Sequence, residues 1–169
     1  KPPNIFMVGR TQPRVLDFGI ARITHQRESG EAMNGAGSPY YMSPEQVRKE
    51  PGDRRTDVFS LGVVLYELLT DTKPFDGDSL KTITQAVLHH EPPLASKVDK
   101  TVPKALAEIA ARAMAKDPEQ RIRSARAFAR DLRQWLDANP AGPEGEPMGA
   151  TVPGAAIPAP RRRAPWIAA

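Results

Sequence analysis

The chain has 169 residues, of which 40% are hydrophobic and 26% are charged, and this length and composition suit one packed globular region with or without a tail. No residue is cysteine, which excludes a disulfide framework, a thiolate metal site and a cysteine nucleophile, and the three histidines do not suggest a zinc site. The net charge of +4 is not gathered into a basic stripe interleaved with aromatic residues, so we expect no binding to nucleic acid.

The first elements expected are two short strands. Apolar runs at residues 5–8 and 14–16 are separated by a polar segment that contains Gly9 and Pro13, and this arrangement is typical of a hairpin. Residues 20–43 carry three glycines among polar residues and show no periodicity, so a long loop is expected there. Loops of this length in compact domains are usually functional or disordered.

Helices are expected after this loop. Residues 57–70 are apolar nearly all round, which is typical of a helix buried at the centre of a domain. A more polar helix is expected over 79–89, and two amphipathic helices are expected over 104–115 and after Ser124, which is the predicted cap of the last helix. Their apolar faces consist of Leu106, Ile109, Ala110 and Ala113, and of Phe128, Leu132, Trp135 and Leu136.

The composition changes near residue 138. Residues 138–169 include seven prolines, nine alanines and four glycines, and so we expect a flexible linker over 138–163. Three consecutive arginines, Arg161 to Arg163, precede Trp166 and a few apolar residues. This order is typical of the cytoplasmic entry to a membrane span, so residues 164–169 are interpreted as the start of a transmembrane helix. The alternative is a basic linker end with an isolated tryptophan.

Six short motifs occur in a fixed order along residues 1–137. They are Lys1-Pro2-X-Asn4, Asp17-Phe18-Gly19, Ser43-Pro44-Glu45, Asp57-X-Phe59-Ser60-X-Gly62, Pro74-Phe75, and Asp117-Pro118 with Arg121. Together they resemble the C-terminal lobe of a protein kinase, from inside the catalytic loop to the last helix. The sequence around several motifs, such as LDFGIAR and YMSPEQ, is most similar to that of the receptor-type serine/threonine kinases of bacteria. The resemblance implies a mainly α fold, with a small hairpin and a helical bundle around the helix at 57–70, and with the N-terminal lobe outside the chain.

The resemblance also implies roles in phosphoryl transfer, which depends on positioning and on neutralising phosphate charge. Asp17 and Asn4 would hold Mg²⁺ and, through it, the phosphates of ATP, because Mg²⁺ prefers hard oxygen ligands. Each of these two residues taken singly could simply form a turn. Their positions at the two ends of the expected hairpin favour the metal-binding role. Lys1 would place an ammonium near the transferring phosphate, and its spacing from Asn4 is typical of serine/threonine kinases. Ser38 occupies the position beside the acceptor site where the family usually has threonine.

Other residues resemble structural positions of the family. Phe18 and Gly19 complete the motif that begins with the metal-binding aspartate. Glu45 resembles a glutamate that forms a buried ion pair with an arginine late in the domain, here Arg121. Asp57 resembles an aspartate at the start of the central helix that accepts hydrogen bonds from the catalytic-loop backbone; an ordinary helix-terminus aspartate is the alternative.

Residues 20–43 would then be the activation loop. Thr24 and Ser29 are candidate phosphorylation sites, because a phosphate there could order the loop by pairing with arginine. An unmodified, solvated serine is an equally good reading of Ser29.

We therefore expect a piece of a serine/threonine kinase that uses ATP and Mg²⁺, acts on Ser and Thr hydroxyls of proteins, and is the cytoplasmic domain of a single-pass membrane protein. Whether the parent protein dimerises is left open. The catalytic base, two residues before Lys1, would lie outside this chain, so the chain alone is expected to be inactive and to expose apolar residues at 5–6 and 15–16. One alternative is a pseudokinase that acts as an interaction scaffold. Another is an unrelated helical module, in which residues 55–137 would fail to pack around 57–70.

Overall fold

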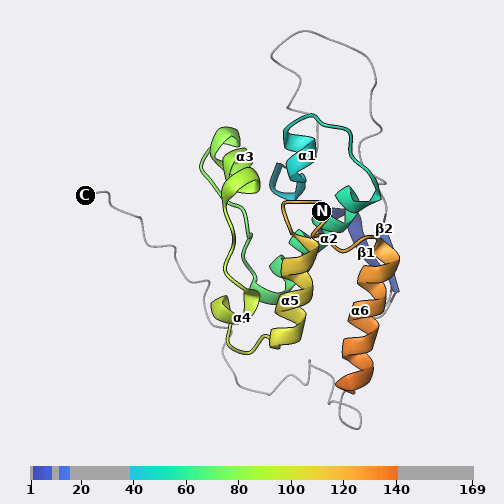
Figure 1. The fold of residues 1–169 in the computed structure, drawn as a ribbon. Coiled ribbons are helices and arrows are strands. Elements are labelled where there is room, and N and C mark those ends of the chain that lie inside the picture. The colour runs from blue at the N-terminus through green and yellow to red at the C-terminus, as the bar shows by residue number, and fades with distance from the viewer. Residues whose placement is uncertain (1, 9–11, 16–38, 141–169) are drawn as a thin grey trace, which may run out of the picture. The chain divides into compact units, whose positions relative to one another are not determined.

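Helices dominate the computed structural model, which describes residues 2–8, 12–15 and 39–140 (Figure 1). The chain divides into two units, residues 1–138 and 139–169, and every element named below lies in the first. The described residues form helices and a single two-stranded antiparallel sheet. The expected mainly α fold with a small hairpin is confirmed.

The hairpin follows a short 3₁₀ helix, η1, at Pro2–Asn4. Strand β1 (Ile5–Val8) pairs antiparallel with β2 (Gln12–Val15), in a register that places Ile5 opposite Val15. The second strand begins two residues earlier than the apolar run predicts, because Gln12 and Pro13 extend the pairing opposite Val8 and Met7. Phe6 and Val15 are each 52% exposed, as expected, whereas Leu16 lies outside the described residues.

The central helix, α2, spans Arg54–Thr70 and begins three residues before the expected start. Asp53 is its N-cap: the Asp53 Oδ1 atom accepts a hydrogen bond of 2.7 Å from the backbone N–H of Arg55. The helix ends at Asp71, which adopts the left-handed conformation with φ 52°. Buried positions lie on several sides of α2, as its sequence predicts, but Leu68 is 73% exposed.

Short elements precede and follow α2. The 3₁₀ helix η2 spans Pro39–Tyr41, within the segment 20–43 that the sequence assigns to a loop, and helix α1 spans Pro44–Val47, directly after that segment. Ser43 caps α1 in a reciprocal arrangement with Gln46, which explains why a helical turn forms directly after the loop. Helix α3 (Leu80–His89), capped by Ser79, is confirmed, and α4 (Ala95–Val98) is a further short helix that the periodicity did not predict.

Helices α5 (Lys104–Ala113) and α6 (Ala125–Ala138) complete the first unit. The Ser124 Oγ atom accepts a hydrogen bond of 3.1 Å from the backbone N–H of Ala127, so Ser124 is the cap that the sequence predicts. Phe128 is buried, but Leu136 is 57% exposed, so its assignment to the apolar face is wrong. At about 100° per residue, Leu136 lies about 80° around the helix from Phe128, at the edge of the buried stripe.

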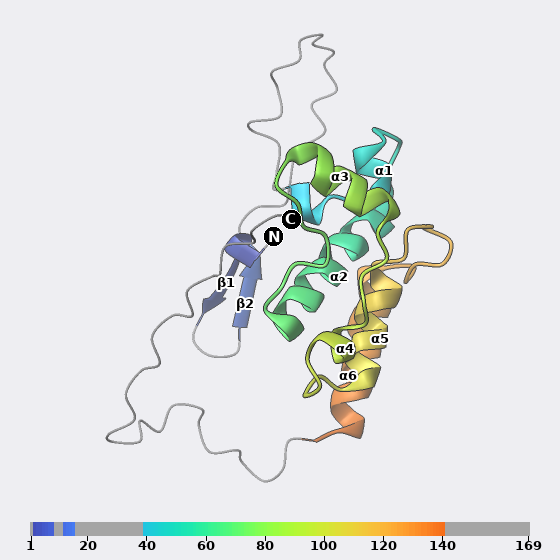
Figure 2. The ribbon, with the colours of Figure 1, turned by 90° about the vertical axis from the view of Figure 1, so that its left-hand side faces the viewer.

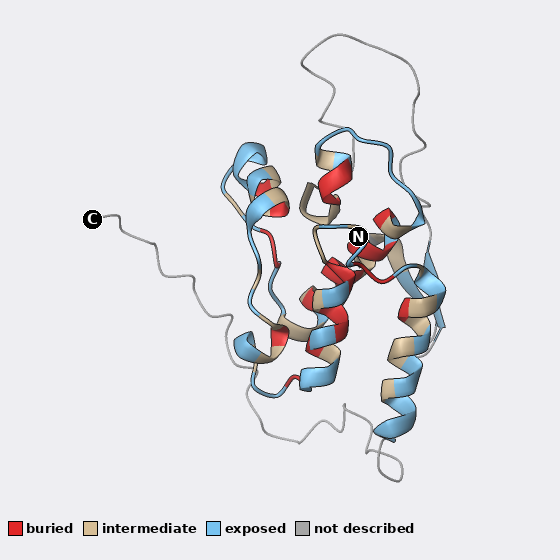
Figure 3. Cartoon of the chain, viewed as in Figure 1, coloured by how far each residue is buried: buried red, intermediate tan, exposed pale blue. Residues whose placement is uncertain are grey.

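The core forms where α2 meets the other helices. One cluster of buried residues includes Phe59, Val63 and Phe75, and a second includes Val58 and Phe128, so α2 supplies side chains to both. Figure 2 shows α4, α5 and α6 on one side of α2, and Figure 3 shows buried residues where these helices face one another. Residues 54–138 therefore pack around the central helix, contrary to the unrelated-module hypothesis.

Helix α5 approaches α2 closely at Gly62. A Cβ atom at this position would lie 2.7 Å from the Cβ of Ala113 and 2.9 Å from the Cγ of Met114. The glycine is thus needed for the contact between the two helices.

Among the helices that the structure describes, none has both the length and the hydrophobicity needed to cross a membrane. The expected linker, apart from its first three residues, and the expected start of a membrane helix lie outside the described ranges.

Candidate active site

The best-defined polar cluster of the described residues is an ion pair between α1 and the segment before α6. Arg121 Nη1 lies 2.7 Å from Glu45 Oε1, and Arg121 Nη2 lies 3.1 Å from Glu45 Oε2. The Arg121 side chain is fully buried and that of Glu45 is 7% exposed. The sequence predicts this pair, and the structure contains it, although the two residues are 76 positions apart.

The remaining donors of the Arg121 guanidinium are also satisfied. They reach three backbone carbonyl oxygens, those of Arg55 (2.9 Å), Ala115 (3.0 Å) and Lys116 (3.3 Å). An arginine offers five N–H donors in a fixed planar fork, and here every one has a partner. The guanidinium also lies 5.1 Å from the centre of the Phe59 ring. Arg121 therefore ties α1, the start of α2 and the segment after α5 to one another.

Burial by itself would raise the pKa of Glu45, but hydrogen bonds outweigh that effect. Arg121 donates two hydrogen bonds to the carboxylate, and Thr56 Oγ1 donates a third over 2.9 Å, so the pKa falls from 4.5 to about 2. Glu45 is consequently ionised at neutral pH, and the cluster is a buried, paired charge rather than a proton donor.

A second set of contacts holds the segment before α1 against α2. Tyr41 Oη donates a hydrogen bond of 2.6 Å to Glu67 Oε2, and Ser60 Oγ donates one of 2.7 Å to the Tyr41 carbonyl oxygen. The Lys73 ammonium lies 4.1 Å from the centre of the Tyr40 ring. Residues 39–45 are thus anchored at both ends, by Tyr41 on α2 and by Glu45 on Arg121. This places the chain that follows Ser38 on a rigid support.

Of the predicted metal ligands, only Asn4 lies in the described part of the chain. It is half-buried at the end of η1, directly before β1. The β1–β2 register places Ile5 opposite Val15, so Asn4 is next to the end of β2 from which the chain continues toward Asp17. The other predicted catalytic, motif and phosphorylation residues lie outside the described residues: Lys1, Asp17, Phe18, Gly19, Thr24, Ser29 and Ser38.

Asp57 is exposed in the first turn of α2 and does not open the helix, because Asp53 does. Within the described ranges, the Asp57 side chain makes no hydrogen bond or ion pair. The hydrogen bonds from catalytic-loop backbone that the resemblance implies are therefore not seen with residues 2–4, the described part of that loop. The position remains compatible with a favourable charge near the N-terminal end of the helix dipole.

Lys116 is a half-buried polar residue beside the core that the sequence reasoning missed. Its ammonium donates a hydrogen bond of 2.8 Å to the Val87 carbonyl oxygen and lies 3.8 Å from the centre of the Phe75 ring. Phe75 in turn stacks on Phe59, with ring centres 5.7 Å apart. Burial lowers the pKa of Lys116 to about 8, and Glu91 only partly opposes this shift. The adjacent Asp117-Pro118 motif was the only sequence signal near this position.

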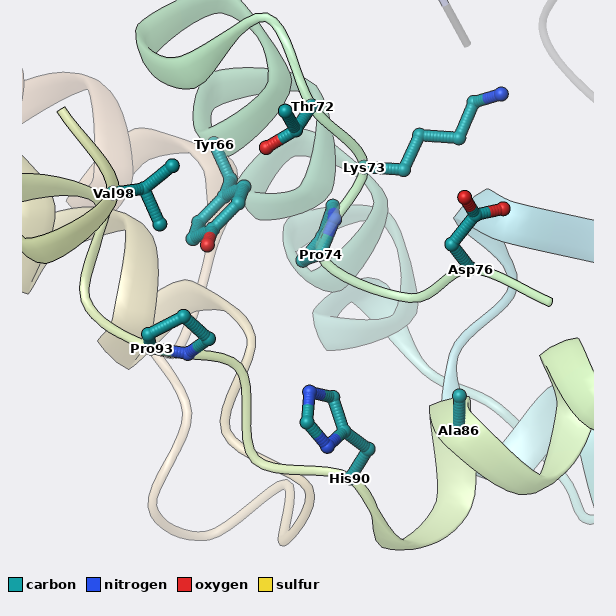
Figure 4. Close-up of a pocket in the computed structure, with 9 residues that line it drawn as sticks. All are labelled: Tyr66, Thr72, Lys73, Pro74, Asp76, Ala86, His90, Pro93 and Val98. Carbon is teal, nitrogen blue, oxygen red and sulfur yellow. The ribbon is translucent and has the colours of Figure 1, made fainter. Parts of the chain in front are cut away.

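A cavity of about 510 Å³ lies beside the C-terminal end of α2 and the chain that follows α3 (Figure 4). Tyr66 is 3% exposed, and its hydroxyl has no hydrogen-bond partner in the described part of the chain. Because no fully buried polar side-chain atom there lacks a partner, this hydroxyl reaches a cavity surface. Burial raises the pKa of Tyr66, so the hydroxyl is a neutral donor. Pro74, Pro93 and His90 also line this cavity, together with the charged residues Lys73 and Asp76.

Comparison with known proteins decides the family. A family model described as "Protein kinase domain" matches residues 1–132, which is most of the chain and includes all six motifs. The chain belongs to the protein kinase family. The buried Glu45–Arg121 pair and the central helix are therefore features of a kinase C-terminal lobe.

Several bacterial kinases are similar to this chain. A probable serine/threonine-protein kinase of Streptomyces coelicolor is 36% identical over 156 residues, which cover 90% of this chain and 22% of that protein. In Myxococcus xanthus, the serine/threonine-protein kinase pkn3 is 39% identical over 143 residues, or 79% of this chain and 26% of pkn3. The tyrosine-protein kinase MasK of the same species is 37% identical over 155 residues, or 90% of this chain and 24% of MasK. The chain thus spans about a quarter of the length of these relatives.

These findings confirm the resemblance to bacterial serine/threonine kinases of the eukaryotic type. The protein kinase family uses ATP and Mg²⁺, and the part of this chain that the structure describes contains no cluster of three or more histidine, aspartate or glutamate side chains that could hold a metal ion. The Mg²⁺ ligands that the motifs imply, Asn4 and Asp17, remain a prediction, since Asp17 lies outside the described residues.

Proposed function

We propose that the protein to which this chain belongs transfers the γ-phosphate of ATP to serine and threonine hydroxyls of proteins. Family membership over residues 1–132 carries this proposal. The Lys1-Pro2-Pro3-Asn4 sequence supports the choice of acceptor, because serine/threonine kinases have a lysine three residues before this asparagine.

Asn4 and Asp17 fit Mg²⁺ by the chemistry of their donors, an amide oxygen and a carboxylate. The hairpin register brings the Asn4 position next to the strand end that leads to Asp17. When bound, Mg²⁺ neutralises charge on the phosphates of ATP. The contribution of the described residues is positioning: the Tyr41–Glu67 hydrogen bond and the Glu45–Arg121 pair hold the chain that follows Ser38, where the protein acceptor binds in this family.

The experiment uses a longer protein that includes the N-terminal lobe. Purified wild type and the variants N4A and D17N are incubated with ATP, Mg²⁺ and peptides that carry serine, threonine or tyrosine as the only acceptor. The wild type should phosphorylate the serine and threonine peptides, and each variant should lose most of this activity. Transfer to tyrosine alone would refute the proposed acceptor class, for which the named activity of MasK provides the alternative.

The 169-residue chain by itself should show no phosphotransfer, because it holds no glycine-rich nucleotide loop of the Gly-x-Gly-x-x-Gly type. A longer protein that folds but also transfers no phosphate would favour the alternative, a pseudokinase that acts as an interaction scaffold. Calorimetry that shows ATP binding without turnover by the longer protein would favour the pseudokinase over the active kinase.

We also propose that the longer protein is anchored in a membrane through the segment that follows Arg163, with the kinase domain in the cytoplasm. The order of Arg161 to Arg163, Trp166 and apolar residues supports this, as does the proline- and alanine-rich stretch before it. Membrane fractionation of the longer protein, with and without the residues after Pro160, tests it. Equal recovery of both in the soluble fraction would refute anchoring.

A further inference from the structure

A hollow with arginine side chains around it lies between α5, the segment 120–123 and α6. It has a volume of about 390 Å³, and four arginines line it: Arg112, Arg121, Arg123 and Arg130. Asp131 is its only acidic lining residue. The positive charge is therefore concentrated in a concave part of the surface, apart from the anchored segment 39–45.

The charges of this hollow do not cancel. Arg121 is neutralised by Glu45, its buried partner. The other three arginines carry +3, and Asp131 carries −1, so the sum over the lining residues is +2. A phosphate monoester carries a charge of about −1.5 to −2 at pH 7, which matches this sum.

The hollow also has unused hydrogen-bond donors. Arg112 Nη2 donates to Asp131 Oδ2 over 2.9 Å, and Arg130 donates to Asp131 Oδ1 through Nη2 over 3.0 Å and Nε over 3.3 Å. Further N–H groups remain on both guanidinium groups. The side chains of Arg123 and Gln120 make no hydrogen bond or ion pair with any residue that the structure describes. Guanidinium forks bind phosphate oxygens in pairs, so this donor set suits a phosphoryl group.

The backbone beneath the hollow is held rigidly. Arg121 is fully buried with all its donors bonded, and Ile122 is 7% exposed. Arg54 Nε donates a hydrogen bond of 3.1 Å to the carbonyl oxygen of Arg123. The contacts of Arg121 and Arg54 therefore hold segment 120–123 in place. Because the backbone of Arg123 is already ordered, the entropic cost of binding through its side chain is lower.

We propose that this hollow binds a phosphorylated serine or threonine of a protein partner. A volume of 390 Å³ exceeds that of the phosphoryl group alone and leaves room for a neighbouring residue against Ile122 and Ala127. The Gln120 amide, which has no partner among the described residues, can bond the peptide backbone of such a protein. The inference rests on the proposed function for the source of the phosphate only, since a serine/threonine kinase makes phosphorylated proteins.

The test measures binding, so it does not require phosphotransfer. The probe is a fluorescein-labelled peptide with a central phosphoserine among alanines and glycines, compared with the same peptide unphosphorylated, and the readout is fluorescence anisotropy at low ionic strength. Variants R123A and R130A are compared with R133A, which removes the same charge from an exposed position of α6 outside the hollow. Far-UV circular dichroism checks that each variant is folded.

The phosphopeptide should bind, and R123A and R130A should each weaken binding about tenfold, whereas R133A should change it less than about twofold. D131N should strengthen binding, because it removes the competing carboxylate. Equal losses in R133A and R123A would show a diffuse basic surface and overturn the proposal. So would failure of the phosphopeptide to bind, or equally tight binding of the unphosphorylated peptide. A longer protein that binds the phosphopeptide but transfers no phosphate would refute only the proposed catalysis.

Discussion

Replacing Arg121 by methionine should strongly destabilise the fold, because it removes one partner of a buried ion pair. Arg121 is fully buried and the Glu45 side chain is only 7% exposed, so R121M leaves a carboxylate without its counter-charge in the interior. Removing one partner of such a pair typically costs about 3–5 kcal/mol. This is a large fraction of the ~5–15 kcal/mol by which domains are usually stable.

The pKa of Glu45 gives a second value for the contribution of this ion pair to the free energy of unfolding. The pKa falls from 4.5 to about 2 in the folded protein, because hydrogen bonds from Arg121 and Thr56 outweigh the effect of burial. At 1.36 kcal/mol per unit, this corresponds to about 3 kcal/mol of folding stability at neutral pH. A lowered carboxyl pKa stabilises the fold above the unfolded value. The contribution is therefore complete above about pH 5 and is lost as the pH falls from about 4.5 toward about 2.

The assay is urea unfolding followed by far-UV circular dichroism, on the wild type, E45Q, R121M and the double variant. The control is E50Q, which removes the same kind of charge from an exposed pair, Arg48–Glu50, and should cost less than about 1 kcal/mol. The double variant should cost less than the sum of the two single variants by at least about 1 kcal/mol. Additive single effects, or a cost of R121M no larger than that of E50Q, would refute the reasoning.

Three further substitutions follow from single contacts. G62A should destabilise the chain by about 1–3 kcal/mol in urea unfolding, because its Cβ would lie 2.7 Å from that of Ala113. K116M should abolish part of the rise in stability between about pH 8 and about pH 10.5, since the lowered Lys116 pKa makes the unfolded state bind more protons in that range. Y41F should cost about 1–2 kcal/mol, because it removes the 2.6 Å hydrogen bond to Glu67.

Each of these has a defined contrary result. A wild-type free energy of unfolding in G62A would mean that the two helices can move apart at little cost. An unchanged pH profile in K116M would mean that Lys116 titrates normally in the folded protein. For Y41F, a matched Y40F variant is the control, because Tyr40 contacts Lys73 through its ring and not through its hydroxyl. Equal effects of Y41F and Y40F would count against the Tyr41–Glu67 bond.

Local patterns predicted the helices well where one short stretch of chain carries all the information. Ser124 acts as a helix cap as expected, and Ser79 caps the helix that was expected to begin there, because a cap bonds backbone groups only three residues away. The start of α2 was misplaced, since the expected range began at Asp57, just before the apolar run, whereas the cap, Asp53, lies upstream of it. Leu136 was misassigned because helical spacing alone does not show how wide the buried face is.

In the site too, some contacts were predicted from the sequence and others were not. The Glu45–Arg121 pair was predicted only through the family resemblance, because no periodicity relates residues 76 positions apart. Thr56 as a third partner, and the Tyr41–Glu67 bond, were not predicted at all. Both join residues on different helices or turns, whose approach depends on how α2 packs. The roles of Asn4, Asp17 and Ser38 remain predictions from the motifs.

The sequence by itself determined the family and the main elements of this protein. The motifs from Lys1 to Arg121 and the apolar spacing were enough, because both are properties of order along the chain. Only the tertiary structure decided which polar groups share the interior, that Lys116 lies on Phe75, and that separate arginines surround one hollow. These depend on distances between residues far apart in sequence, and packing of the helices around α2 sets those distances.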